Sequence, residues 1–194
     1  MIAFKGFNNN LACTMGKGIF QYEVGKRYTT QKAQCANTGF HCVEEPIEVL
    51  SWYRNSTSRY CIVEAMGDIH EDGYERISCT EIKIMRELTL LELALLECKF
   101  LQKHPNREYS RHVQRNTGHA DTDGFVIVRG KQPKASGKKG TYLFLLKENA
   151  NSSEIEEISV LEVDGEKIKP GRYYRPDGKE IHECTKQNSG AKEH

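Results

Sequence analysis

Residues 35–68 constrain the fold of this chain most, because their pattern predicts a strand, a short helix and a second strand in close succession. Thr38-Gly39 interrupts the chain before a short strand expected at 40–43. Pro46 favours the start of a helix, since its missing N–H would have no partner in a first helical turn. The run 60–65 is rich in β-forming residues and follows a polar turn. The stretch therefore predicts a helix packed on a sheet.

Composition places the chain among globular proteins with a core of their own. Of its 194 residues, 38% are hydrophobic and 28% are charged, and the net charge is +1. This balance gives no overall attraction to nucleic acid or to acidic surfaces. No apolar run approaches the roughly 18 residues of a membrane-spanning helix, and the N-terminus MIAFKGFNNN lacks the build of a signal peptide. We therefore expect a cytoplasmic protein without a membrane partner.

Cysteine usage favours reduced thiols. Seven cysteines occur, at positions 13, 35, 42, 61, 79, 98 and 184, and no CxxC motif is present. An odd number in a chain of this length argues against a disulfide framework, and several sit in apolar patterns typical of buried thiols. A zinc site built from Cys35, His41 and Cys42 would lack a second ligand pair. The sequence therefore predicts no metal site.

Residues 1–105 are expected to form an α+β core domain, a mixed sheet with two helices. Strands are predicted at 2–7, at 60–65 ending at Gly67-Asp68, and at 77–85, where Ile77 and Ile82 fall on opposite sides. Thr89 and Glu92 fit a capping box for a helix over 90–103. The apolar stripe expected on that helix consists of Leu91, Ala94, Leu95, Cys98 and Leu101.

The remainder is predicted to contain a polar connector at 106–124, a small antiparallel β domain at 125–184 and a disordered tail at 185–194. Strands are expected at 125–129, 141–147 and 155–163, with hairpin turns at Asp164-Gly165 and Asp177-Gly178. Residues 130–140 are interpreted as a flexible basic loop, whose lysines are Lys131, Lys134, Lys138 and Lys139. Because this cluster is short and has no interleaved aromatic residues, nucleic-acid binding is not expected.

Several motifs together resemble an uncharacterised family encoded by bacteriophages and prophages. They are FKGF, FQYEVGKRY, GFHCVEEPIEVLSWY, SRYCIVEAMGDI and VDGEKIKPGRYY. Members of that family look like an N-terminal domain of unknown function, and many carry a run of NTG-type β repeats before a closing β unit. Here the run has shrunk to the surroundings of Asn116-Thr117-Gly118. The resemblance implies a phage-type protein acting in the cytoplasm of a bacterial host, without naming an activity.

A second resemblance points to the ADP-ribosyltransferase fold, with its split sheet, and to NAD as cofactor. It implies that Lys5 occupies the place of the first-strand arginine or histidine and binds the cofactor. It also implies that His41, on the glycine-led second strand, is a catalytic residue. Tyr53 would pack on the nicotinamide, and Glu75 would be the catalytic glutamate, with Glu81 as a substitute. The chain departs from that family at Lys5, has no Ser-Thr-Ser motif and has no ExE or QxE pair at Glu75.

The chemistry of that family explains the residue types. When nicotinamide leaves, the ribose becomes oxocarbenium-like, and a nearby carboxylate such as that of Glu75 stabilises the positive charge. An aromatic face holds the departing ring, and Arg54 and Arg59 would clamp the diphosphate, because guanidinium groups pair with phosphate in bidentate fashion. Each residue also has a purely structural interpretation. Glu75 would be a turn carboxylate, His41 a hydrogen-bonded histidine and Tyr53 part of the packing at a helix end, while Arg54 and Arg59 would be surface residues.

Three functions therefore remain open at the level of sequence. The first is an ADP-ribosyltransferase-like core that binds NAD or a related nucleotide and acts on a host protein. The second is a non-catalytic inhibitor of a host defence system, similar to an anti-CRISPR protein, that works by protein–protein binding. The third is a structural or virion-associated module, which the loss of nearly all the β repeat disfavours. NAD binding, a stable host partner and presence in purified particles would distinguish the three.

Overall fold

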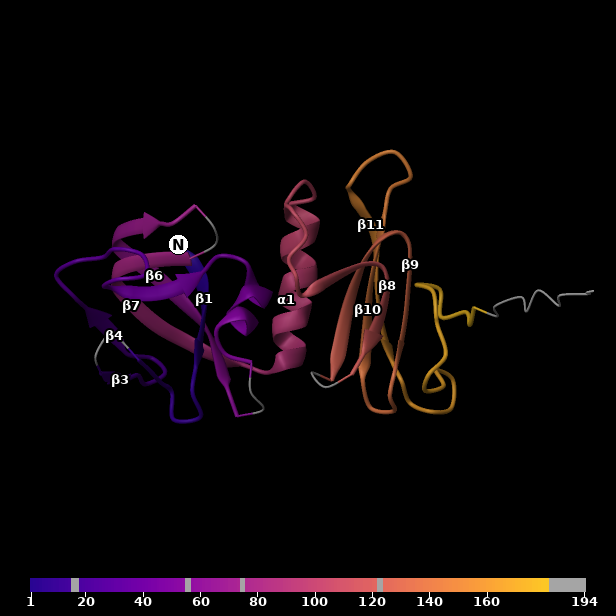
Figure 1. The fold of residues 1–194 in the computed structure, drawn as a ribbon, viewed down its shortest axis with the longest axis horizontal. Coiled ribbons are helices and arrows are strands. Elements are labelled where there is room, and N and C mark those ends of the chain that lie inside the picture. Colours follow the sequence, from indigo (N-terminus) through magenta and orange to yellow (C-terminus); the bar gives the residue numbers. More distant parts are fainter. Residues whose placement is uncertain (15–17, 55–56, 74–75, 122–123, 182–194) are drawn as a thin grey trace, which may run out of the picture.

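The computed structural model describes residues 1–14, 18–54, 57–73, 76–121 and 124–181, and within these the protein is mostly β with few helices. Two groups of strands flank a central layer that contains the α-helix α1, Leu90–Lys103 (Figure 1). The largest hydrophobic cluster includes residues from both flanking sheets and from α1, for example Val43, Leu101 and Phe144. The N-terminal and C-terminal parts therefore share a core through the helix layer.

The N-terminal sheet is antiparallel, and most of its strands form a closed ring of pairings. Its strands are β1 (Ile2–Phe7), β4 (Arg27–Thr29), β5 (Phe40–Val43), β6 (Arg59–Glu71) and β7 (Arg76–Leu88). The order is β4-β7-β5-β1-β6, and β6 also pairs with β7. A small hairpin of β2 (Ala12–Thr14) and β3 (Ile19–Gln21) lies beside this sheet. The closed arrangement encloses a second core, in which Cys42, Cys61 and Cys79 are free thiols, as the apolar patterns predicted for two of them.

Strand β6 is longer than expected, because it continues through Gly67-Asp68 to Glu71. The pairing register with β7 shifts between Met66 and Ile69, and Gly67 absorbs this bulge with a φ of 71°. The predicted faces of β7 also differ from the structure, because Ile77 and Ile82, expected on opposite sides, both belong to the enclosed core.

The helix layer contains α1 and a 3-10 helix, η1, at Pro46–Ser51, where the sequence predicted a helix starting at proline. The capping box of α1 is present: the Thr89 hydroxyl accepts from the Glu92 N–H, and the Glu92 carboxylate accepts from the Thr89 N–H at 2.9 Å. The buried stripe differs from the predicted one. Leu95 is 40% exposed, whereas Glu97 is fully buried in its place.

The C-terminal sheet is mixed, so the prediction of an antiparallel unit was wrong. Its order is β11-β10-β9-β8, and only the β10–β11 pairing is antiparallel. Strands β10 (Tyr142–Glu148) and β11 (Ile155–Glu162) match expectation closely. Strand β8 (Val113–Ala120) lies inside the stretch interpreted as a connector, and β9 (Phe125–Gly137) includes most of the expected basic loop.

The parallel pairings show that the chain winds here as a short β-solenoid. Thr117 pairs with Lys134 and Phe125 pairs with Tyr142, and the offset along the chain is the same in both. Parallel strands ordinarily need a long crossover connection. Here the second halves of β8 and β9, which pair with each other, form the connection to the next parallel strand. Asn116 turns the corner of β8 with a φ of 61°, and a Cβ on Gly130 would collide with its side chain. The NTG tripeptide therefore lies at a corner of the coil.

Small residues let the two sides of the coil approach each other. A Cβ on Gly118 would collide with Val126 and Val128, whose side chains point into the coil. The opposite face of the same sheet, including Ile127 and Phe144, packs in the core with α1. Strand β10 is thus buried on both faces, which explains its nearly continuous apolar sequence.

The last described segment closes the open side of the coil. Tyr174 forms bridges with Ala135 and with Glu180, and Val163 joins the interior cluster. The Asp164 carboxylate accepts from three consecutive backbone N–H groups, at 2.8–3.0 Å, so this position forms a side-chain-stabilised loop rather than the expected two-residue hairpin. The expected tail lies outside the described residues. Among those described, no helix has the length and apolarity needed to span a membrane.

Candidate functional site

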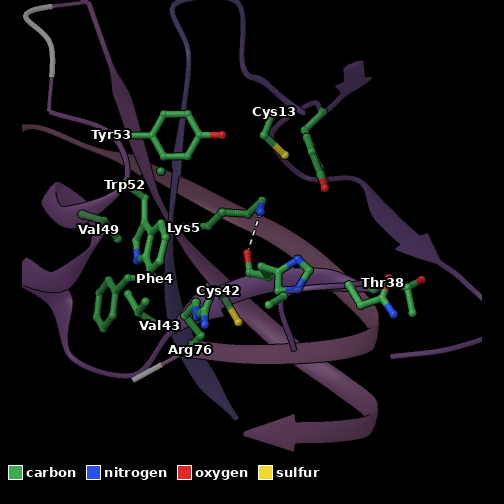
Figure 2. A pocket seen from close by; sticks show the side chains of 16 residues that line it. Phe4, Lys5, Cys13, Thr38, Cys42, Val43, Val49, Trp52, Tyr53 and Arg76 are labelled. Atoms are coloured by element: carbon green, nitrogen blue, oxygen red, sulfur yellow. Dashed lines mark hydrogen bonds between the residues drawn. The ribbon is translucent and has the colours of Figure 1, made fainter. Parts of the chain in front are cut away.

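A cavity of about 390 Å³ opens between β1, β5, the hairpin of β2 and β3, and the end of η1 (Figure 2). Its volume lies within the range of small-molecule sites in proteins. Figure 2 shows Tyr53 and Cys13 on one side and Cys42 and Val43 on the other, with the Lys5 side chain extending between them. Basic and aromatic side chains line it, and none of the described lining residues is acidic.

Lys5 is the central charge of the cavity. The residue is 5% exposed, and its Nζ donates to the backbone carbonyl oxygen of His41 at 2.5 Å. The same Nζ lies 5.4 Å from the centre of the Tyr22 ring and 5.5 Å from that of Phe7. No carboxylate pairs with Lys5 in the described part of the chain. Burying an ammonium group without a counter-ion is costly, so an anionic ligand would stabilise this arrangement.

His41 supplies an unsatisfied polar group on the neighbouring strand. Its Nε2 is buried and has no hydrogen-bond partner among the described residues. Burial lowers the pKa of the imidazole, and the positive charge of Lys5 lowers it further. The ring is therefore neutral at pH 7. A neutral imidazole can accept or donate one hydrogen bond at Nε2 according to its tautomer, and buried groups of this kind normally have a partner.

Tyr53 forms an aromatic wall directly after η1. A Cβ on Gly6 would lie only 2.6 Å from the Tyr53 ring, so the glycine in β1 allows the ring to lie on the strand. Burial, and to a lesser extent the neighbouring Cys13, raise the pKa of Tyr53 to about 12. The pKa of the buried Tyr22 phenol is also raised, mainly by burial. Both tyrosines line the cavity and carry neutral phenol groups.

Trp52 and Arg76 lie at the mouth. Trp52 is 57% exposed, and the Arg76 guanidinium carbon lies 5.0 Å from the centre of its ring. Arg76 is held by an ion pair with Asp72 at 2.5 Å. A cation prefers to lie over the face of an indole ring. The pair therefore places a positive charge and an exposed aromatic surface together at the mouth of the cavity.

The structure brings together three of the six residues that the sequence proposed. Lys5, His41 and Tyr53 come from three different elements and line one cavity. Arg59 instead forms a bidentate pair with Glu87, at 2.6 Å for both contacts, and does not line the cavity. Arg54 lines a separate surface hollow. The expected clamp by these two arginines is therefore not assembled at the cavity, where the cations are Lys5 and Arg76.

Of the two proposed carboxylates, only Glu81 lies in the described part of the chain. Glu75 lies outside the described residues, although the next residue, Arg76, lines the cavity. Glu81, considered as its substitute, pairs with Arg27 at 2.8 Å and is not part of the cavity lining. Sequence reasoning missed Tyr22 and Arg76 as lining residues. Tyr22 belongs to the quoted motif FQYEVGKRY, but nothing in its local pattern indicates which cavity its ring borders.

A buried carboxyl group contacts η1, the short helix that precedes Tyr53. The Glu97 carboxyl oxygen accepts from the Ile47 N–H, in the first turn of η1, at 3.2 Å. Burial raises the pKa of Glu97 well above its ordinary value, and the nearby Glu45 raises it further. Arg107 pairs with Glu45 at 3.3 Å. The buried Glu97 carboxyl group therefore links α1 to η1.

The comparisons with known proteins concern the N-terminal part. Residues 1–96 match the model of a family described as a domain of unknown function, DUF7666. The matched stretch includes all the residues that line the cavity, and the match is consistent with the resemblance to an uncharacterised family. No curated protein matches the chain, and no solved structure matches it. Over its first half, the chain is thus similar to a family whose description assigns no activity.

Proposed function

We propose that the cavity binds NAD or a related nucleotide, and that residues 1–105 form an ADP-ribosyltransferase-like core acting on a host protein. The observation that supports this most is the convergence of Lys5, His41 and Tyr53 on one cavity. The resemblance to ADP-ribosyltransferases implies a cofactor-binding role for Lys5 and Tyr53 and a catalytic role for His41 from the sequence alone. They lie far apart in the sequence, on β1, on β5 and after η1.

The chemistry of each side chain suits a part of the nucleotide. The Tyr53 ring offers a face for nicotinamide, and the neutral His41 Nε2 can hydrogen-bond to a ribose hydroxyl or to the carboxamide. Lys5 and Arg76 would face the negative diphosphate. In the transfer step, the bond between ribose C1′ and the nicotinamide nitrogen breaks, and nicotinamide leaves with the electron pair. The acceptor then bonds to C1′ and releases a proton, while Glu75 stabilises the cationic ribose.

Calorimetric titration of NAD into the purified protein tests the binding part. His41→Gln is expected to weaken affinity about tenfold or more, because a hydrogen bond to the ligand is lost in a buried site. His70→Gln is the matched control, since His70 is exposed on β6 and does not line the cavity. Equal weakening by both variants, or an unchanged affinity in His41→Gln, would exclude this cavity as the binding site.

Incubation with tagged NAD and host lysate tests the transfer part, with the wild type compared against Glu75→Gln. Label transfer that disappears in the variant would support the enzyme and its glutamate. Transfer that survives would retain the enzyme and discard Glu75. If the protein neither binds NAD nor transfers label, the proposal is wrong, and inhibition of a host defence protein by surface binding becomes the account to pursue.

A further inference from the structure

A second hollow, of about 1100 Å³, follows the corner of the C-terminal coil. Strand β8 contributes Arg115, Asn116 and Thr117 to it, and β9 contributes Lys131, Gln132 and Lys134. The loop after α1 adds Tyr109, and the closing segment adds Arg175. These residues form what we call the corner groove. It lies in the half of the chain that the family match does not cover and is separate from the candidate nucleotide cavity.

The corner groove concentrates positive charge on a protein of nearly neutral net charge. Its cations are Arg115, Lys131, Lys134 and Arg175, and its acidic residues are Glu148 and Glu180. Both acids are engaged: Glu148 accepts from Arg129 Nε at 2.7 Å and from the Tyr109 hydroxyl at 2.8 Å, and Glu180 lies 3.7 Å from Arg172. Arg175 lies 3.9 Å from the Asp177 carboxylate, which leaves Arg115, Lys131 and Lys134 as the groove cations that pair with no carboxylate in the described part of the chain.

A buried arginine lies behind the groove and neutralises one of its two acidic residues, Glu148. Arg129 is 1% exposed, and it contacts Glu148 and the Ser153 carbonyl oxygen, both of which line the groove. Its Nη1 is buried without a hydrogen-bond partner among the described residues. Glu148 thus has a cation on its buried side, so it does not offset the exposed cations of the groove.

Aromatic rings accompany the cations, although the local sequence of β9 contains none between its lysines. The Arg115 guanidinium carbon lies 4.2 Å from the centre of the Tyr109 ring. Lys134 Nζ lies 5.4 Å from the centre of the Tyr173 ring, at the margin of the groove. Folding brings both tyrosines from other segments. The sequence argument against nucleic acid depended on the shortness of the lysine cluster and on its lack of interleaved aromatic residues. In the folded protein, residues from other segments extend the cluster and supply aromatic rings.

We infer that the corner groove binds single-stranded nucleic acid with little sequence preference. Cationic grooves that follow the phosphates and planar groups on which bases stack are the two parts of such sites. Lys131 and Lys134 supply the first, and Arg115 on Tyr109 supplies a flat stacking platform. An acidic peptide would use the charges but not the platform, which favours a nucleic acid strand as the occupant.

Fluorescence anisotropy with the full chain and a labelled oligothymidylate of about 15 nucleotides tests the inference, since single-strand sites span roughly 4–16 nucleotides. The logarithm of affinity should fall linearly with the logarithm of salt concentration. Arg115→Gln and Lys134→Gln should each weaken binding and reduce that slope by about 0.7, the contribution of one phosphate contact on a single strand. Lys99→Gln, on the exposed side of α1, should change neither.

Arg115→Lys separates stacking from charge, because lysine keeps the charge and lacks the planar guanidinium. It should weaken binding while leaving the salt slope unchanged. The inference is overturned if the oligonucleotide does not bind at low salt, or if Lys99→Gln weakens binding as much as Lys134→Gln. It is also overturned if polyglutamate of equal charge displaces the oligonucleotide as well as unlabelled oligothymidylate does, which would assign the groove to acidic polypeptides instead.

Discussion

The Nζ of Lys5 on β1 lies 2.5 Å from the backbone carbonyl oxygen of His41 on β5, so the buried ammonium links two paired strands across the candidate nucleotide cavity. The contact satisfies one of three N–H groups of the ammonium. No carboxylate compensates its charge in the described part of the chain. An arrangement of this kind adds little to the stability of the free protein and is suited to an anionic ligand.

Lys5→Met tests that relationship. We expect the free energy of unfolding, measured by urea denaturation, to stay within about 1 kcal/mol of the wild type or to rise, because replacing a buried charge by an apolar side chain of similar size is often neutral or stabilising. NAD binding by calorimetry should be lost. A loss of several kcal/mol in stability would show that Lys5 serves the fold instead.

Gly6→Ala tests the position of the aromatic wall. The added Cβ would lie 2.6 Å from the Tyr53 ring, so the ring must move, at an expected cost of about 1–3 kcal/mol. NAD affinity should fall with it. Gly18→Ala is the matched control, because a Cβ there would meet nothing within 4 Å. Similar denaturation midpoints for the two variants would contradict the packing described.

Glu97→Gln tests the raised pKa of the buried carboxyl group that contacts η1. Because the pKa of Glu97 is raised in the folded state, the folded protein retains a proton that the unfolded chain releases above its ordinary pKa. The stabilisation is complete below that value and is lost as pH rises toward the folded pKa. The unfolding free energy of the wild type should therefore fall over this range, whereas that of Glu97→Gln should fall less. Identical pH profiles would mean that Glu97 is ionised in the folded protein; Glu108→Gln, at an exposed position, is the control.

A double-mutant cycle tests the narrow interior of the coil. Gly118→Ala should destabilise by about 1–3 kcal/mol, because its Cβ would collide with Val128. Val128→Ala alone leaves a cavity. The double variant should be less destabilised than the sum of the two single variants, because each change relieves the strain or the void that the other creates. Additive effects, measured by urea denaturation, would indicate that the two side chains do not face each other.

Local signals in the sequence predicted the elements that depend on neighbouring residues. The capping box of Thr89 and Glu92 and the strand at 2–7 occur where expected, because each is determined within a few positions. Strand β8 escaped prediction, since its exposed residues look like a loop and only pairing with β9 makes it a strand. Glu97 likewise resembles a surface residue until η1 and Glu45 are placed against it.

The candidate cavity was predictable only in part. The resemblance to a known fold indicated Lys5, His41 and Tyr53, and these do line one cavity. Arg59 was also expected at the cavity. Nothing in the local sequence indicates that its guanidinium group pairs instead with Glu87, which lies on the neighbouring strand β7. Arg76 and Tyr22 reach the cavity only through the pairing of distant strands.

The most direct test of the nucleotide site uses Trp52, the only tryptophan of the chain, which lies at the mouth of the cavity. Titration with NAD should change its fluorescence in a saturable manner in the wild type and in Gly18→Ala. The change should be absent in Lys5→Met, after correction against free tryptophan amide at the same absorbance. A response in the wild type that Lys5→Met retains, or a purely linear response in every protein, would contradict the account of this cavity as a nucleotide site.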